Sequence, residues 1–118
     1  MAGARGEAFP RARRVRKRLD YLRIQNQGRR FSTPHFLIFT LPSTAGADAA
    51  TRFGVTVSRK VGDAVTRNRV KRWIRESCRR WADVPPRLDV VIVARPQAAA
   101  LGFAPTSTEL ASLTKRLR

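Results

Sequence analysis

The sequence predicts an α+β domain in which a small, mostly antiparallel sheet packs against helices, in the order helix, strand, strand, helix, strand, helix. Two observations support this prediction. Residues 64–81 repeat apolar side chains at helical spacing. Three short runs, at residues 35–41, 52–58 and 89–94, are rich in β-branched and aromatic residues and are typical of strands.

The N-terminal residues have no sustained apolar period and contain Gly, Ala, Pro and several Arg, so we expect residues 1–14 to be a flexible basic arm. Residues 15–118 have the length of a single domain with one modest core. Within it, the first helix is predicted over residues 18–27, with Asp20 near its positive end and Gly28 as its C-terminal stop.

The two strands that follow differ in their patterns. Residues 35–41 are apolar on both faces, and the small polar residues 42–51 are typical of a hairpin loop between antiparallel strands. In residues 52–58, large apolar residues alternate with small or polar ones, so one face packs and the other stays open as a candidate binding surface. The open face consists of Gly54, Thr56 and Ser58.

The longest helix, predicted over residues 64–81, has two different faces. The packing stripe is mainly apolar and consists of Val70, Trp73, Ile74, Ser77, Cys78 and Trp81. The other stripe is mainly basic and consists of Arg67, Asn68, Lys71, Arg72, Arg75 and Arg79. Such a helix packs with one face, and its basic face is either a solvated surface or a surface for a partner.

The rest of the chain predicts one strand and one helix. Pro85 and Pro86 end the long helix, and residues 89–94 have the composition of a buried strand. Thr106 and Glu109 have the spacing of a capping box at the start of the last helix. Its apolar stripe consists of Leu110, Leu113 and Leu117.

The net charge of the chain is +17, from 25 Lys and Arg against 8 Asp and Glu, which exceeds what solubility requires. Residues 1–30 hold ten of these cations and residues 58–81 hold nine. Such clustering is typical of a surface that follows a row of phosphates. The charge therefore predicts a polyanionic partner.

Several other classes of protein are disfavoured. No stretch approaches the roughly 18 to 20 apolar residues that span a bilayer, and no apolar segment follows the basic start, so we expect a cytoplasmic chain with no membrane partner. Cys78 is the only cysteine, which excludes an internal disulfide. His35 is the only histidine, and we expect it at the surface or in packing. Because the eight carboxylates are scattered, we expect neither catalytic residues nor a bound metal on the protein itself.

The most informative segment runs from Ser58 to Glu76 and joins a strand, a glycine turn and the basic helix. Arg67 and Arg69 lie in the first turns of that helix, where the macrodipole disfavours cations by about 0.3 to 1 kcal/mol each. A bound phosphate would reverse this penalty, so the pattern indicates a functional surface.

This segment resembles the bacterial ribonuclease P protein family, whose hallmark is Arg-Asn-Arg followed by Lys-Arg on the helix after a glycine-containing turn. The resemblance extends over about residues 15–117 and is most specific between residues 52 and 76. It implies a sandwich related to a ribosomal protein domain, with a left-handed crossover. It also implies the protein subunit of an endoribonuclease that removes the 5′ leader of precursor tRNA. In that enzyme the RNA subunit carries the catalysis and mainly holds the Mg²⁺.

The resemblance assigns two binding surfaces, one for the RNA subunit and one for precursor tRNA, with no obligate protein partner. The leader would stack in a cleft between the first helix and the sheet, on Tyr21, Phe39 and Phe36. Phe36 and Phe39 are alternatively ordinary core residues, and Asn68 alternatively braces the turn. Gln25 stands where the family often has a second aromatic residue. The RNA subunit would contact Arg59, Lys60, Arg67, Asn68, Arg69, Lys71, Arg72 and Arg75.

Two other functions fit part of the pattern. A ribosomal or other structural RNA-binding protein would share the charge, the small sheet and the lack of catalytic residues, and it differs only in the motif and the aromatic cleft. A DNA-binding module would need a recognition helix whose exposed face mixes Arg with Asn, Gln or Ser. The exposed face predicted here is nearly all Arg and Lys.

Overall fold

The structure is a computed structural model that describes residues 14–15, 17–43, 51–81 and 87–117. Of the predicted N-terminal arm, only Arg14 lies within the described residues, where it forms an isolated parallel bridge with Phe53. The elements confirm the predicted α+β class. In chain order they are α1 (Arg18–Gln27), β1 (Arg29–Ser32), β2 (Phe36–Pro42), β3 (Arg52–Thr56), α2 (Ala64–Arg79), β4 (Leu88–Ala94), the 3-10 helix η3 (Pro96–Ala100), α3 (Phe103–Ala111) and the 3-10 helix η4 (Thr114–Leu117).

The four strands form one mixed sheet with the order β1-β2-β4-β3. The β1–β2 and β2–β4 pairs are antiparallel, whereas β3 runs parallel to β4, with α2 connecting them. The hairpin predicted between residues 35–41 and 52–58 is therefore wrong, because β4 lies between those two strands. Alternation within a strand predicts which side chains share a face, but not which strand becomes its neighbour.

Strand β1 is the element that the sequence pattern does not reveal. Two arginines and a serine surround its single apolar residue, Phe31, and such a composition has little strand preference. The strand forms because a tight turn folds it back on β2: the backbone N–H of Phe36 donates to Thr33 Oγ1 at 3.1 Å, and the backbone N–H of Thr33 donates to the Phe36 carbonyl oxygen at 2.9 Å. Strand β1 thus forms one edge of the sheet. The chain has three strands before α2, where the sequence predicted two.

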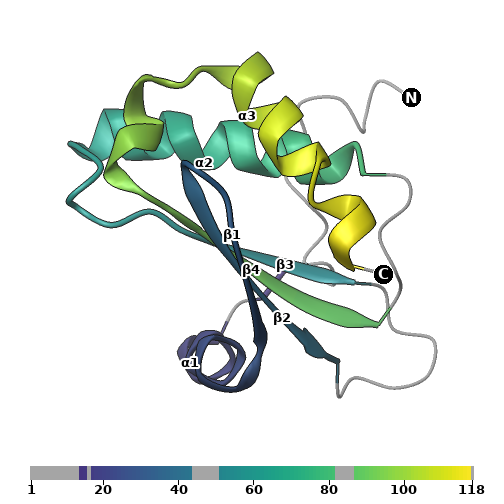
Figure 1. The fold of residues 1–118 in the computed structure, drawn as a ribbon. Coiled ribbons are helices and arrows are strands. Elements are labelled where there is room, and N and C mark those ends of the chain that lie inside the picture. The colour runs from purple at the N-terminus through teal and green to yellow at the C-terminus, as the bar shows by residue number, and fades with distance from the viewer. Residues whose placement is uncertain (1–13, 16, 44–50, 82–86, 118) are drawn as a thin grey trace, which may run out of the picture.

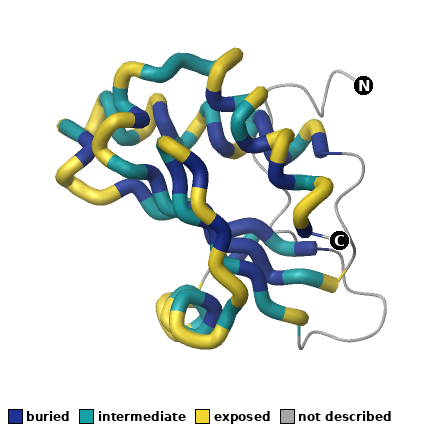
Figure 2. Tube along the Cα trace, viewed as in Figure 1, coloured by how far each residue is buried: buried dark blue, intermediate teal, exposed yellow. Residues whose placement is uncertain are grey.

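The helices lie on opposite faces of the sheet, with α1 on one side and α2 and α3 on the other (Figure 1). The main core fills the space between the sheet and α2 and α3, where the buried segments face one another (Figure 2). The predicted stripe of α2 is confirmed, except that Trp73 is only half-buried and Trp81 lies two residues beyond the end of the helix. The buried side chains of that stripe are Val70, Ile74, Ser77, Cys78 and Trp81.

The last helix begins earlier than the sequence indicates, so the predicted capping box is wrong. Helix α3 starts at Phe103, because Pro105 fits the first turn, where no intrahelical N–H is required. Thr106 therefore lies inside the helix and is fully buried, and Glu109 bonds to His35 instead. The three leucines of the predicted apolar stripe, Leu110, Leu113 and Leu117, are buried, but only Leu110 lies on α3, which ends at Ala111.

Helix α1 has the predicted bounds and covers a smaller core of Val15, Ile24 and Val91. Gly28 follows it as predicted, but its φ of −77° is not left-handed. The reason for glycine is space: a Cβ atom there would lie 2.5 Å from the carbonyl oxygen of Ile24 and 2.6 Å from that of Thr40. Any larger residue would push α1 away from the sheet.

Candidate RNA-binding interface

The basic surface predicted on α2 is present on the described residues. Asp63 caps the helix, and its side chain accepts a hydrogen bond of 2.9 Å from the backbone N–H of Thr66. Arg67 is held against the turn by a 3.2 Å bond from Nε to the Gly62 carbonyl oxygen. Arg67 and Lys71 are both half-buried. The remaining predicted contacts of the RNA subunit are exposed: Arg59, Lys60, Asn68, Arg69, Arg72 and Arg75.

Asp63 also places a negative charge at the start of α2, close to Arg67 and Arg69. The hydrogen bond from the Thr66 backbone N–H lowers the pKa of the Asp63 carboxyl, and the charges of Arg69 and Arg67 lower it further. The cap is therefore an anion at the position where the helix dipole favours one. The Asp63 carboxylate therefore partly offsets the unfavourable interaction of Arg67 and Arg69 with the positive end of the helix dipole.

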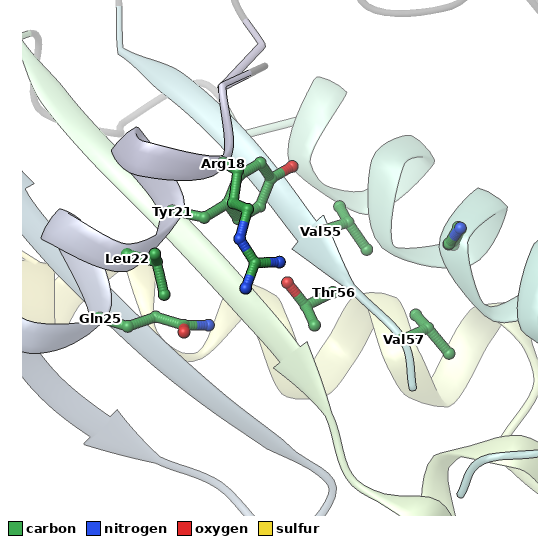
Figure 3. A pocket seen from close by; sticks show the side chains of 8 residues that line it. Arg18, Tyr21, Leu22, Gln25, Val55, Thr56 and Val57 are labelled. Atoms are coloured by element: carbon green, nitrogen blue, oxygen red, sulfur yellow. The ribbon is translucent and has the colours of Figure 1, made fainter. Parts of the chain in front are cut away.

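A cleft opens between α1, the end of β3 and α2. Its volume is about 470 Å³. Figure 3 shows side chains of α1 directed toward those of β3 and the residue after it. Lys71 belongs both to the cleft and to the basic surface of α2, so the two surfaces are continuous. The cleft is lined by Arg18, Tyr21, Leu22, Gln25, Val55, Thr56, Val57 and Lys71.

The three predicted cleft aromatics have different positions. Tyr21 lines the cleft. Phe39 lies on the α1 side of the sheet, partly buried against the small core against which Tyr21 also packs, and is not among the lining residues. Phe36 has 0% exposure and belongs to the main core on the opposite face, so its assignment to the cleft is wrong. Alternation explains the difference, since positions 36 and 39 point to opposite faces of one strand.

Helix α1 is fixed to the sheet by an ion-pair network that sequence reasoning missed. The Asp89 side chain is fully buried and accepts hydrogen bonds from Arg52 Nε at 2.9 Å, Arg52 Nη2 at 2.8 Å and Arg23 Nη2 at 3.0 Å. The bond to Asp89 raises the pKa of Arg52. Asp20 lies at the rim of this network, 3.8 Å from Arg23 and 3.9 Å from Arg52. A lone carboxylate within an apolar strand was the signal that could have revealed it.

The β1–β2 turn is fixed to α3 by Glu109. Its carboxylate accepts from the His35 backbone N–H at 2.8 Å and lies 2.7 Å from His35 Nδ1. Burial raises the pKa of Glu109, but hydrogen bonds from Thr33 and His35 outweigh it and leave the pKa below its usual value. His35 thus has a packing role, as predicted.

Among residues 14–15, 17–43, 51–81 and 87–117, no three His, Cys, Asp or Glu side chains are grouped so that they could hold a metal ion. No helix in this part of the chain is long and apolar enough to cross a bilayer.

Together, the fold and the two continuous surfaces define a basic α+β domain with cations and an aromatic-edged cleft at its surface. The solved ribonuclease P protein of Thermotoga maritima, in complex with 1-(4-fluorophenyl)-2-thiourea, is similar to this chain with a TM-score of 0.79 and 32% identity, covering 89% of this chain and all of that one. The Staphylococcus aureus protein gives a TM-score of 0.76 and 28% identity, with 88% and 94% covered.

Sequence comparison leads to the same group. The chain is 44% identical to the ribonuclease P protein component of Desulfovibrio desulfuricans over 112 residues, which covers 92% of this chain and 85% of the relative. The Ribonuclease P family matches residues 9–118, so part of the predicted arm falls within the match. The chain belongs to the ribonuclease P protein family.

Proposed function

We propose that this chain binds the catalytic RNA subunit of ribonuclease P and the 5′ leader of precursor tRNA, and so assists endonucleolytic removal of the leader. The observation that carries the proposal is the continuity of the basic α2 surface with the cleft through Lys71. A ligand that follows the cations along α2 reaches the cleft without leaving the positively charged surface.

The α2 surface is the proposed contact with the RNA subunit. Its exposed guanidinium and ammonium groups neutralise phosphates, and the release of condensed counterions drives such binding. The side chains project from one helix whose other face is buried in the main core. The cations are therefore presented by a rigid element, as positioning of a large RNA requires.

The cleft is the proposed site of the leader. Tyr21 offers a ring on which a base can stack, and Arg18 and Lys71 offer cations for the flanking phosphates. Stacking is indifferent to sequence, which suits a protein that acts on many precursor tRNAs. Gln25 lines the cleft where a second ring would stand, so this chain stacks fewer bases on α1 than relatives with an aromatic residue there.

Hydrolysis is assigned to the RNA subunit. Mg²⁺ held mainly by that RNA would supply the activated water, and the protein's cations would reduce the repulsion between the two RNAs. No step of the reaction is assigned to a side chain of this protein.

The proposal is tested by recovering the RNA bound to the tagged full chain from its native cells. One structured RNA that cleaves precursor tRNA at lower Mg²⁺ when the protein is added is the expected result. Recovery of ribosomal RNA alone would instead support a structural RNA-binding role. Cleavage of precursor tRNA by the protein freed of RNA would overturn the assignment of catalysis.

A further inference from the structure

A second pocket lies on the outer side of α2, where α2 meets the start of α3. It has a volume of about 310 Å³ and is lined by Arg72, Trp73, Glu76, Arg80 and Phe103. It shares no lining residue with the cleft between α1, the end of β3 and α2. We call it the α2/α3 pocket.

Two aromatic rings form the apolar part of the α2/α3 pocket. Trp73 is half-buried, packing against the main core, and Phe103 is half-buried at the first position of α3. Both rings are anchored in their helices, yet both contribute surface to the pocket. A volume near 310 Å³ is at the small end of ligand pockets, as suits one planar group rather than a larger molecule.

The charged residues of the pocket favour an anionic ligand. The Arg80 guanidinium carbon lies 5.2 Å from the centroid of the Phe103 ring, and Arg72 is exposed about two helical turns before Arg80. Glu76 is the one carboxylate of the lining, and both of its oxygens accept hydrogen bonds from Arg79. Because Arg79 balances Glu76, the net charge at the rim is that of Arg72 and Arg80.

We propose that the α2/α3 pocket receives one unstacked nucleobase of the RNA subunit, with Trp73 and Phe103 as stacking surfaces. Arg72 and Arg80 would contact the phosphates on either side of that base. Rings at the floor with guanidinium groups at the rim are the chemistry of single-stranded nucleotide recognition. The inference rests on the proposed function, since Arg72 is also one of the cations assigned to the RNA subunit.

The ring of Phe103 provides the first test. Phe103→Leu keeps an apolar side chain but removes the stacking surface, whereas Phe103→Tyr keeps the ring. In a titration with the cognate RNA subunit, we expect Phe103→Leu to weaken binding by about five- to a hundredfold and Phe103→Tyr to bind like the wild type. The slope of log K against log salt should be unchanged in both, because no phosphate contact is removed.

The fluorescence of Trp73 provides the second test. The chain has two tryptophans, and Trp81 is only 9% exposed, against the ring of Phe53. The RNA subunit should therefore quench the emission of the wild-type protein but not that of Trp73→Phe, in which only Trp81 remains. Thermal melting of each variant shows whether a loss of binding reflects unfolding.

The outcomes separate this inference from the proposed function. If the wild type fails to bind the RNA subunit, the proposed function is wrong. If the wild type binds but Phe103→Leu binds equally well and Trp73 is not quenched, the RNA interface stands and the base pocket does not. A melting temperature of Phe103→Leu equal to the wild type, together with a binding loss that Phe103→Tyr lacks, supports the base pocket. Quenching by an acidic protein in place of RNA would assign the pocket to a protein partner and overturn it.

Discussion

The ring of Tyr21 lies directly on the backbone of Gly54: a Cβ atom at position 54 would be 2.7 Å from Tyr21 Cε1. This contact joins α1 to β3 at one side of the cleft and fixes the height of the ring above the sheet. Glycine at position 54 is therefore a requirement of the proposed leader site and not only of the strand.

Replacing Gly54 should displace the ring of Tyr21. Gly54→Ala is expected to destabilise the fold by about 1 to 3 kcal/mol through overpacking, and to weaken binding of precursor tRNA more than that of mature tRNA. The measurement is urea unfolding together with the two affinities. In a Tyr21→Leu background the same alanine should cost less, because the ring it strikes is gone. Equal costs in both backgrounds would contradict the contact.

The basic surface of α2 can be distinguished from charge in general by its salt response. Lys71→Ala and Arg72→Ala should each reduce the slope of log K against log salt for the RNA subunit by about one unit, if each contacts one phosphate. Lys115→Ala is the matched control, since Lys115 is an exposed cation on η4 and not on α2. An equal change of slope for all three variants would show that net charge alone matters.

The buried carboxylate of Asp89 should be a major contributor to stability. Asp89→Asn leaves Arg52 and Arg23 without their anion, and we expect a loss of about 2 to 4 kcal/mol, since these guanidinium groups keep some contact with water. Asp20→Asn is the control, because its ion pairs are longer and partly exposed, and it should cost less than about 1 kcal/mol. Similar losses in the two variants, measured by urea unfolding, would argue against the network.

Glu109 should contribute a pH-dependent stability. Because its pKa is lowered in the folded state, its contribution is present above the ordinary glutamate pKa and is lost as the pH falls through the lower folded value. The free energy of unfolding of the wild type should therefore fall more steeply below about pH 4.5 than that of Glu109→Gln. Parallel curves for the two proteins would mean that the bonds to His35 and Thr33 do not favour the carboxylate.

The sequence predicts local features of this protein better than long-range ones. The bounds of helix α1 follow from Asp20 near its start and Gly28 after its end, and the packing stripe of α2 follows from helical spacing. The position of β4 between β2 and β3 does not, because neighbouring strands are chosen by the whole sheet. Strand β1 depends on a turn held by Thr33, and its arginines carry no strand preference. At the candidate site, Tyr21 was predictable by resemblance. Alternation places Phe36 and Phe39 on opposite faces, but because the strand is apolar on both faces, the sequence does not show which of these two faces lies toward α1.

Phe39 gives the sharpest test of the leader site, because the same strand provides its control. Phe39 packs against the small core under α1, as Tyr21 does, and Phe36 is fully buried on the other side. Leucine at either position keeps most of the apolar volume but removes the flat ring. Phe39→Leu should unfold only slightly more easily, by about 1 kcal/mol.

Phe39→Leu should also lower holoenzyme affinity for precursor tRNA with a leader by about five- to a hundredfold, with little loss for mature tRNA. Phe36→Leu should instead lower the melting temperature and leave the ratio of the two affinities unchanged, since its ring faces the main core. Because Phe39 packs under α1 without lining the cleft, its ring must become accessible when the leader binds. An unchanged affinity ratio in Phe39→Leu would confine the leader to Tyr21 and the other residues that line the cleft.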